Sequence, residues 1–225
     1  MMKGTLFVLF MAIAFCSPMV LFTPASAQQV EGVVILAAKK NSVNIGGRYG
    51  RPSGSASSSG SSSDSVLVWL ESNTASIKGA TEKPVLLNQK GLSFKPSLIV
   101  VRQNGTVRIR NSDPVYHNVF SLSSIKRFDV GRRPKGEYLD VMFDKPGAVD
   151  VFCDIHSNMR ATIYVIPPNV VTWTKVKSGD SFSLENIGTG DYQLKMYALG
   201  YQERSISVEI TSGEPTDVGT LTLNF

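Results

Sequence analysis

The stretch "DKPGAVDVFCDIHSNMRATIYVI", residues 144–166, contains two strand-like runs separated by a short loop. Alternation along the first run places Val149, Val151 and Cys153 on one face, so Cys153 is expected to point inward with the valines. The second run, "ATIYVI", is rich in apolar and β-branched residues, which favour strands. We therefore expect the loop 154–160 to join two strands at one end of a sheet.

Three potential metal ligands lie at three-residue intervals on this stretch: Cys153, His156 and Met159. Zinc is satisfied by Cys and His, and calcium and magnesium prefer oxygen, whereas thiolate, imidazole and thioether donors together suit copper. In such a copper site two His and one Cys form a plane with a weak axial Met. The fourth ligand must then come from a distant segment. His117 is the candidate, because the chain has only two histidines.

The N-terminus has the features of a secretory signal peptide. Lys3 precedes an apolar run, and the small-residue site "ASA" follows it. Cleavage is expected after Ala27, with a retained membrane anchor as the alternative. Loss of Cys16 would leave residues 28–225 with one cysteine, which cannot form an internal disulfide and so favours a metal ligand. The chain is expected to be exported to the periplasm or cell envelope, with no membrane span in its mature part.

The remainder of the chain predicts an all-β protein. Short apolar runs recur between turns rich in Gly and Pro, and no convincing amphipathic helix is present, which indicates β-sandwiches. The segments 30–38 and 66–72 are predicted to be strands of the first domain. The Ser-rich segment 52–65 between them is predicted to be a flexible loop, because it cannot bury apolar surface.

Two hairpins and one domain boundary are also predicted. "SLIVVRQNGTVRIRNSD" is expected to form a hairpin with its turn at Asn104-Gly105. A second hairpin-like unit is expected around the turn 145–147. Pro167-Pro168 marks a boundary between a domain spanning 28–166 and one spanning 167–225. Beyond it, strands are expected at 182–184, 192–197, 206–210 and 218–223.

The ligand-bearing segments resemble those of a known family. "PVYHNVFSLS" and "FDKPGAVDVFCDIHSNM" are similar to the ligand segments of the cupredoxins, the small blue copper proteins. The Cys-x-x-His-x-x-Met spacing resembles amicyanin, and "HNV" resembles the first-histidine segment of plastocyanin. The layout is also similar to exported plastocyanin-like proteins of the methylamine-utilisation type, in which a further β domain follows the copper fold. The resemblance covers residues 66–166 well and 30–38 more loosely.

The cupredoxin resemblance implies a fold and a site. The fold is a Greek-key cupredoxin β-sandwich followed by a small prealbumin-like β-sandwich. The site is a type 1 (blue) copper centre with the ligands His117, Cys153, His156 and Met159. Asn118 is implied to tie the two ligand loops together, as outer-shell partners do. Asp154 departs from the family, in which a small hydroxyl residue often follows the cysteine, and its carboxylate could lower the reduction potential.

The second domain resembles another family more weakly. "SFSLENIGTGDYQLKMYALGY" is similar to carboxypeptidase regulatory-like β domains, which implies a scaffold or docking role for residues 167–225. The chain has no free histidine for a Ser–His–acid set if both bind metal, and no Walker or GxGxxG motif follows a strand. Four protein ligands also leave no position for substrate. We therefore expect a non-enzymatic one-electron carrier that exchanges electrons with a redox partner protein.

Two other functions remain open on the sequence alone. One is an envelope copper-binding or copper-delivery protein without a redox partner, and the other is a structural or ligand-binding β protein. The net charge of +5, from 23 basic and 18 acidic residues, is too small to indicate nucleic-acid binding. A basic cluster is interpreted as a solvated loop, with docking to an acidic partner as the alternative. Its members are Lys126, Arg127, Arg132, Arg133 and Lys135.

Overall fold

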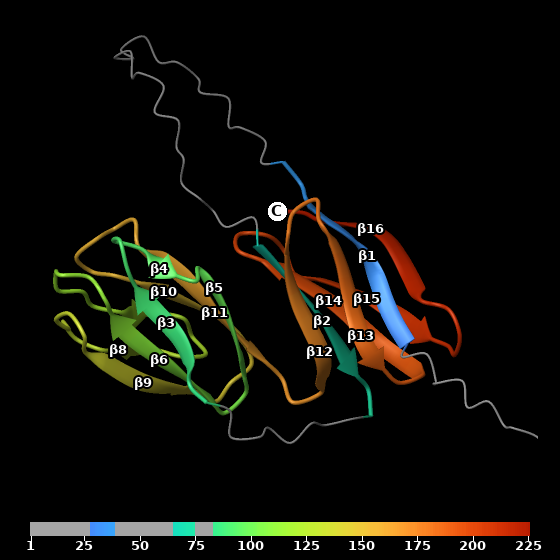
Figure 1. The fold of residues 1–225 in the computed structure, drawn as a ribbon, viewed down its shortest axis with the longest axis horizontal. Coiled ribbons are helices and arrows are strands. Elements are labelled where there is room, and N and C mark those ends of the chain that lie inside the picture. The colour runs from blue at the N-terminus through green and yellow to red at the C-terminus, as the bar shows by residue number, and fades with distance from the viewer. Residues whose placement is uncertain (1–27, 39–64, 75–82) are drawn as a thin grey trace, which may run out of the picture.

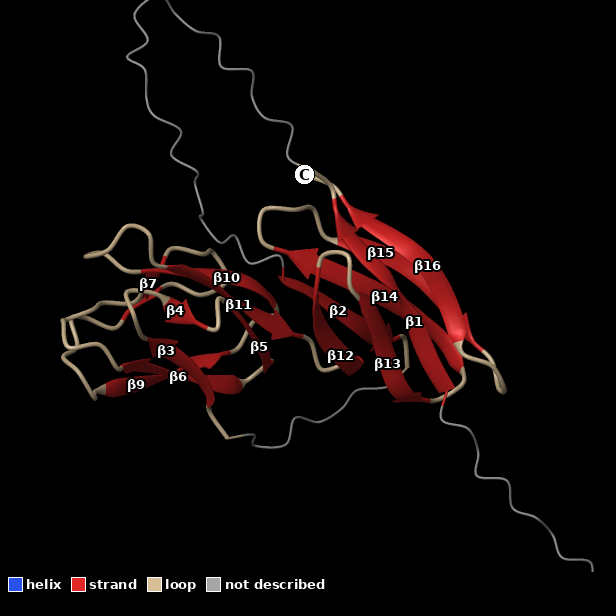
Figure 2. Ribbon diagram, turned by 45° about the horizontal axis from the view of Figure 1, so that its top comes forward, coloured by secondary structure: helices blue, strands red, loops and turns tan. Residues whose placement is uncertain are grey.

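The computed structural model describes residues 28–38, 65–74 and 83–225. The predicted signal peptide, Cys16 and all but the last residue of the Ser-rich segment lie outside these residues. The described part of the chain consists of strands, turns and loops (Figure 2). This confirms the all-β prediction. None of the described residues forms a helix long and apolar enough to cross a membrane.

The described residues form sixteen strands, numbered in chain order. They are β1 (Gln28–Leu36), β2 (Ser65–Ser72), β3 (Val85–Gln89), β4 (Phe94–Lys95), β5 (Leu98–Arg102), β6 (Gly105–Asn111), β7 (Phe120–Ser121), β8 (Phe128–Asp129), β9 (Tyr138–Phe143), β10 (Gly147–Phe152), β11 (Arg160–Ile166), β12 (Val170–Lys177), β13 (Ser181–Ile187), β14 (Gly190–Ala198), β15 (Arg204–Ile210) and β16 (Thr216–Leu223).

Strands β3 to β11 form the first sandwich, coloured green to gold in Figure 1. One sheet has the order β5-β11-β10-β7-β8 and the other β4-β3-β6-β9. Their facing side chains, such as Leu87, Ile99, Phe143, Val151 and Ile163, form one buried core. Burial alternates along β6 and β10, with Val107, Ile109, Val149 and Val151 in the core, as in strands that are buried on one face.

The two predicted hairpins are wrong in the same way. Both turns exist, and Asn104 adopts a positive φ of 65°. However, β5 pairs in parallel with β11, whereas β6 pairs with β3 and β9 in the opposite sheet. Likewise β9 pairs with β6, and β10 pairs with β11 and β7. Each turn therefore carries the chain across the sandwich. The local alternation pattern is the same for a hairpin and for such a crossing, since both bury one face of each strand.

Strands β1, β2 and β12 to β16 form the second sandwich, in sheets ordered β13-β1-β16 and β12-β2-β14-β15. The assignment of segments 30–38 and 66–72 to the first domain is therefore corrected. Strand β1 pairs with β13 and β16, and β2 pairs with β12 and β14. Inward residues of β1 and β2, among them Val34 and Leu70, share a buried core with the C-terminal strands. The first sandwich is thus an insertion between β2 and β12 (Figure 1).

A third buried cluster joins the two sandwiches. The outer face of β2 contributes Leu67 and Trp69, and the outer faces of β5 and β11 contribute Val100, Tyr164 and Ile166. The rings of Trp69 and Tyr164 lie 5.0 Å apart at their centroids. Strand β11 therefore buries both faces: one faces the first core and the other this interface. Such burial explains its continuous run of apolar residues.

We predict that Trp69→Ala destabilises the protein strongly. Trp69 is only 1% exposed at the interface, so its loss should lower the free energy of unfolding by about 3–5 kcal/mol. The matched control is Trp173→Ala, because Trp173 lies directly opposite Trp69 on β12 but is 38% exposed. Trp173→Ala should lower the free energy of unfolding by clearly less than Trp69→Ala. Urea unfolding followed by circular dichroism measures both, and equal losses would contradict a buried interface between the sandwiches.

Candidate metal centre

The loop between β10 and β11 forms as predicted. The two strands are antiparallel neighbours, and their ladder ends at the pair Phe152 and Arg160. The N–H of Cys153 donates to the carbonyl of Met159 at 3.3 Å, and the N–H of Met159 donates to the carbonyl of His156 at 3.0 Å. These bonds close the loop into a compact turn. Cys153 is buried in the same core as the inward valines of β10, as the alternation predicted.

His117 reaches this loop from a segment 36 residues earlier in the chain. Its N–H donates to the carbonyl of Arg133 at 3.1 Å, and the N–H of Arg133 donates to the carbonyl of His117 at 2.7 Å. Three residues later, Phe120 of β7 pairs with Phe152 of β10. This ladder pair places the segment beside the strand that ends at Cys153. The His117 side chain is completely buried there.

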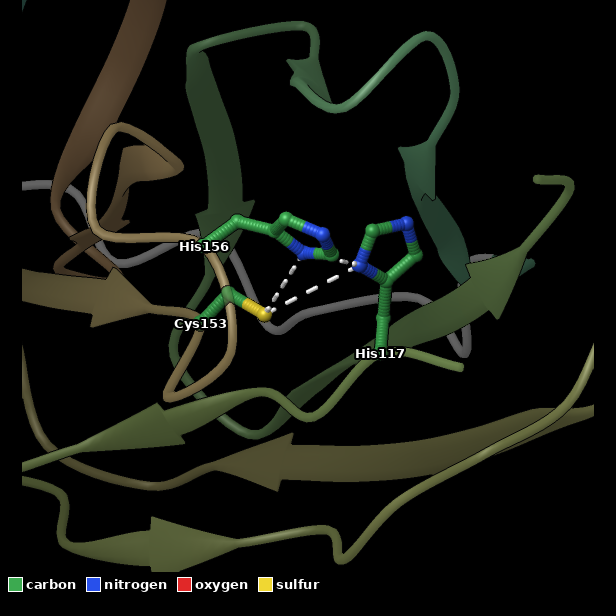
Figure 3. A group of neighbouring side chains, drawn as sticks. All are labelled: His117, Cys153 and His156. Atoms are coloured by element: carbon green, nitrogen blue, oxygen red, sulfur yellow. Dashed lines mark hydrogen bonds between the residues drawn. The ribbon is translucent and has the colours of Figure 1, made fainter. Parts of the chain in front are cut away.

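The side chains of His117, Cys153 and His156 converge on one point (Figure 3). The Cys153 Sγ atom lies 3.8 Å from His117 Nδ1 and 3.9 Å from His156 Nδ1. The two Nδ1 atoms are 3.1 Å apart. The imidazole rings meet edge to face, with an interplanar angle of 62°. One sulfur and two nitrogens thus form a small triangle of donor atoms.

This triangle has the dimensions of a metal site. Bond lengths of about 2.0 Å to nitrogen and about 2.3 Å to sulfur, with angles between tetrahedral and trigonal, separate two nitrogens by about 3.3–3.5 Å and nitrogen from sulfur by about 3.5–3.7 Å. The N···N distance of 3.1 Å and the S···N distances of 3.8 and 3.9 Å lie within about 0.2 Å of these ranges. The donor set, with its thiolate and the Met159 thioether on the same loop, points to copper.

Met159 ends the loop and is 1% exposed. It belongs to the same buried cluster as Cys153, and its backbone accepts and donates the two bonds that close the loop. An unbranched thioether in this position is protected from water. Its predicted role as the axial ligand remains a prediction.

The two residues predicted to surround the site, Asn118 and Asp154, differ in burial. Asn118 is buried, and its backbone carbonyl accepts a hydrogen bond from Gln89 Nε2 at 3.5 Å. Its side-chain Oδ1 has no hydrogen-bond partner among the described residues, and its implied role in tying the ligand loops together stays a prediction. Asp154 follows Cys153 with an exposed side chain. Its predicted influence on the potential stays a prediction.

Asp113 is the residue that sequence reasoning missed. Its Oδ2 atom lies 2.9 Å from Nε2 of His117, and its side chain is 8% exposed. A neutral imidazole has one N–H, and a carboxylate beside Nε2 draws that proton there. Nδ1 is then left with its lone pair directed at the sulfur and at His156. The pairing of a carboxylate with a ligand histidine is a common arrangement around protein-bound metals.

Asp113 is held as a carboxylate by its own hydrogen bonds. Burial alone would raise the pKa of Asp113, but N–H groups of Leu92 and Gly91 and the ring of His117 more than offset this effect, so its pKa lies below the ordinary value. The two backbone donors lie at 3.0 and 2.6 Å from its oxygens. Asp113 precedes His117 by four residues outside any helix, a spacing that carries no expectation of contact.

In the basic cluster Arg127, Arg132 and Lys135 are exposed, and Lys126 and Arg133 are half-buried. Lys126 pairs with Asp144 at 3.3 Å and Arg133 with Glu137 at 3.5 Å. The backbone of Arg133 has the further role of pairing with His117. Exposed pairs of this kind contribute little stability.

Comparisons with solved structures find copper proteins at low similarity. The match covers 42% of this chain and only 25% of the Cu-containing nitrite reductase NirK from Thermus scotoductus SA-01, at 25% identity and a TM-score of 0.38. A reduced amicyanin mutant matches 44% of this chain and 98% of its own, at 16% identity and a TM-score of 0.36. A purple cupredoxin from Nitrosopumilus maritimus matches 36% and 99%, at 18% identity and a TM-score of 0.34. No family model and no curated protein matches. At such TM-scores, function must be judged from the site itself.

We predict that metal binding stabilises the fold and that Cys153 is required for it. Zn²⁺ is a suitable probe because it is redox-inert and accepts Cys and His ligands. At free Zn²⁺ about 100 times the dissociation constant, the free energy of unfolding should rise by about 2.7 kcal/mol. Thermal melts with and without a chelator measure this gain. If Zn²⁺ stabilises Cys153→Ala as much as it stabilises the wild type, Cys153 is not a metal ligand.

Proposed function

We propose that this protein is a type 1 copper protein that carries single electrons. The observation that carries the proposal is the triangle formed by His117 Nδ1, His156 Nδ1 and Cys153 Sγ, with sides of 3.1, 3.8 and 3.9 Å. Two imidazoles and one thiolate are the equatorial set of blue-copper electron-transfer sites. Met159 is proposed as the weak axial ligand. When bound, copper supplies the Cu(I)/Cu(II) couple.

The chain contributes a rigid and dry frame for these donors. His117 is held by backbone bonds to Arg133, and the turn carrying Cys153 and Met159 is closed by its own backbone bonds. His117, Cys153 and Met159 are all buried. Side chains fixed in this way change little when the charge at the site changes by one unit, which favours fast electron transfer over chemistry on a substrate.

His156 is the proposed route for the electron. Its side chain is partly exposed, whereas His117 is fully buried and directed at Asp113. The edge of the His156 ring is therefore the ligand surface that a partner protein can approach. With four protein ligands there is no position for a substrate, so a non-enzymatic role is proposed. The signal-like N-terminus supports export to the periplasm or cell envelope as part of the same proposal.

The spectrum of the copper-loaded protein tests this function. We expect an intense visible absorption band from the Cys153 thiolate, a matching electron-spin-resonance signal and one reversible one-electron wave. His117→Ala should lose the band. Met159→Leu should keep it and shift the reduction potential, because the axial ligand tunes that potential.

The matched control is Met142→Leu, since Met142 is a methionine exposed on β9. It should leave both the band and the potential unchanged. A copper-loaded wild type without the band would contradict a type 1 site. A protein that shows the band but exchanges electrons slowly and loses copper readily to chelators would point to copper delivery instead.

A further inference from the structure

We propose that Asp113 is a positioning residue for the copper site: its carboxylate fixes the ring orientation and tautomer of His117 and lowers the reduction potential of the copper bound there. This inference rests on the proposed function. It concerns a residue that makes no contact with the metal itself and acts through a ligand.

The contact between Asp113 and His117 is short and protected. Asp113 Oδ2 and His117 Nε2 are 2.9 Å apart, and the two side chains are 8% and 0% exposed. Water therefore competes little for either group. A hydrogen bond between a buried carboxylate and a ring N–H is stronger than one between neutral groups, so it holds the ring firmly.

The carboxylate cannot turn away from His117, because other bonds fix it. The N–H groups of Gly91 and Leu92 donate to its two oxygens, and the Leu92 N–H shares Oδ2 with His117. Gly91 and Leu92 have φ angles of 66° and 53°, an uncommon conformation for leucine. This turn presents two successive N–H groups to a single anion, which is the arrangement of an anion-binding nest.

Asn111, the last residue of β6, holds the same segment through its side chain. Its Oδ1 accepts the N–H of Asp113 at 2.9 Å, and its Nδ2 donates to the carbonyls of Val115 and Arg133 at 2.8 Å each. Arg133 is in turn the backbone partner of His117. The network is therefore closed: Asn111 holds the segment of Asp113, Asp113 holds the His117 ring, and Arg133 holds both the His117 backbone and Asn111.

A negative charge at this position favours the higher oxidation state. The carboxylate makes the His117 imidazole a stronger donor, and its field attracts a doubly charged ion more than a singly charged one. Loss of an outer-shell partner typically weakens metal binding 10- to 100-fold. If Cu(II) loses about tenfold more affinity than Cu(I), the potential rises by about 59 mV.

The test is Asp113→Asn in the full copper-loaded chain. Asparagine keeps the size and one acceptor oxygen but removes the charge. We expect the blue band to persist, Cu(II) affinity to fall about 10-fold or more, and the potential to rise by about 59 mV. The charge-matched control is Asp140→Asn, because Asp140 bonds to Arg108 on the exposed sheet of the same sandwich. The reduction potential of Asp140→Asn should stay near that of the wild type.

The outcomes separate this inference from the proposed function. A wild type without the blue band overturns the copper proposal, whatever Asp113 does. A blue wild type whose potential and Cu(II) affinity are unchanged in Asp113→Asn, or shift equally in Asp140→Asn, overturns the role of Asp113 alone.

A measurement on the metal-free wild type covers the case in which Asp113→Asn fails to fold. Nitrogen NMR of the two histidines should show the proton of His117 on Nε2, exchanging slowly with solvent, because it is buried against Asp113. His156 lacks a carboxylate partner among the described residues and serves as the internal control, with faster exchange. A proton found on Nδ1 of His117 would overturn the inference.

Discussion

The backbone pairing of His117 with Arg133 is the constraint on which the site depends. Cys153 and His156 are brought together by a short loop, and any chain with this spacing could place them near each other. The second imidazole is 36 residues away, and two backbone hydrogen bonds, together with the pairing of Phe120 with Phe152, bring it to the sulfur. These contacts are made between backbone groups of the chain itself. The donor triangle is therefore a product of the sandwich.

Burial of His117 carries an energetic requirement that the surrounding residues meet. A fully buried imidazole has two ring nitrogens, and each needs a polar partner because an unpaired one costs about 1–3 kcal/mol. Asp113 satisfies Nε2, and within the described chain the polar atoms next to Nδ1 are the nitrogen of His156 and the sulfur of Cys153. A metal ion meets the needs of all three donors at once. Cys153 and Met159 belong to the buried hydrophobic cluster of the first sandwich, so apolar side chains pack around this end of the site.

Sequence reasoning succeeded where the deciding information is local. The inward direction of Cys153, the loop between β10 and β11 and the absence of helices from the described chain all follow from alternation and spacing. It failed where the information is long-range. The sequences of β1 and β2 have the pattern of strands, and they were predicted as such. However, their residues do not indicate which sheet each strand joins. Asp113 was missed for the same reason, because its contact with His117 depends on how an irregular turn folds.

The second sandwich packs against β11 toward the end of that strand that lies away from the donor triangle. Strand β11 leaves the ligand loop at Arg160 and ends at Ile166, a span of about 20 Å for seven residues. Its outward side chains Tyr164 and Ile166 are buried against the second sandwich, whereas its first residue borders the loop that carries His156. The second sandwich thus packs against one end of β11, and the ligand loop lies at the other end. The buried interface therefore holds β11 at the end away from the ligand loop, where His156 stays partly exposed.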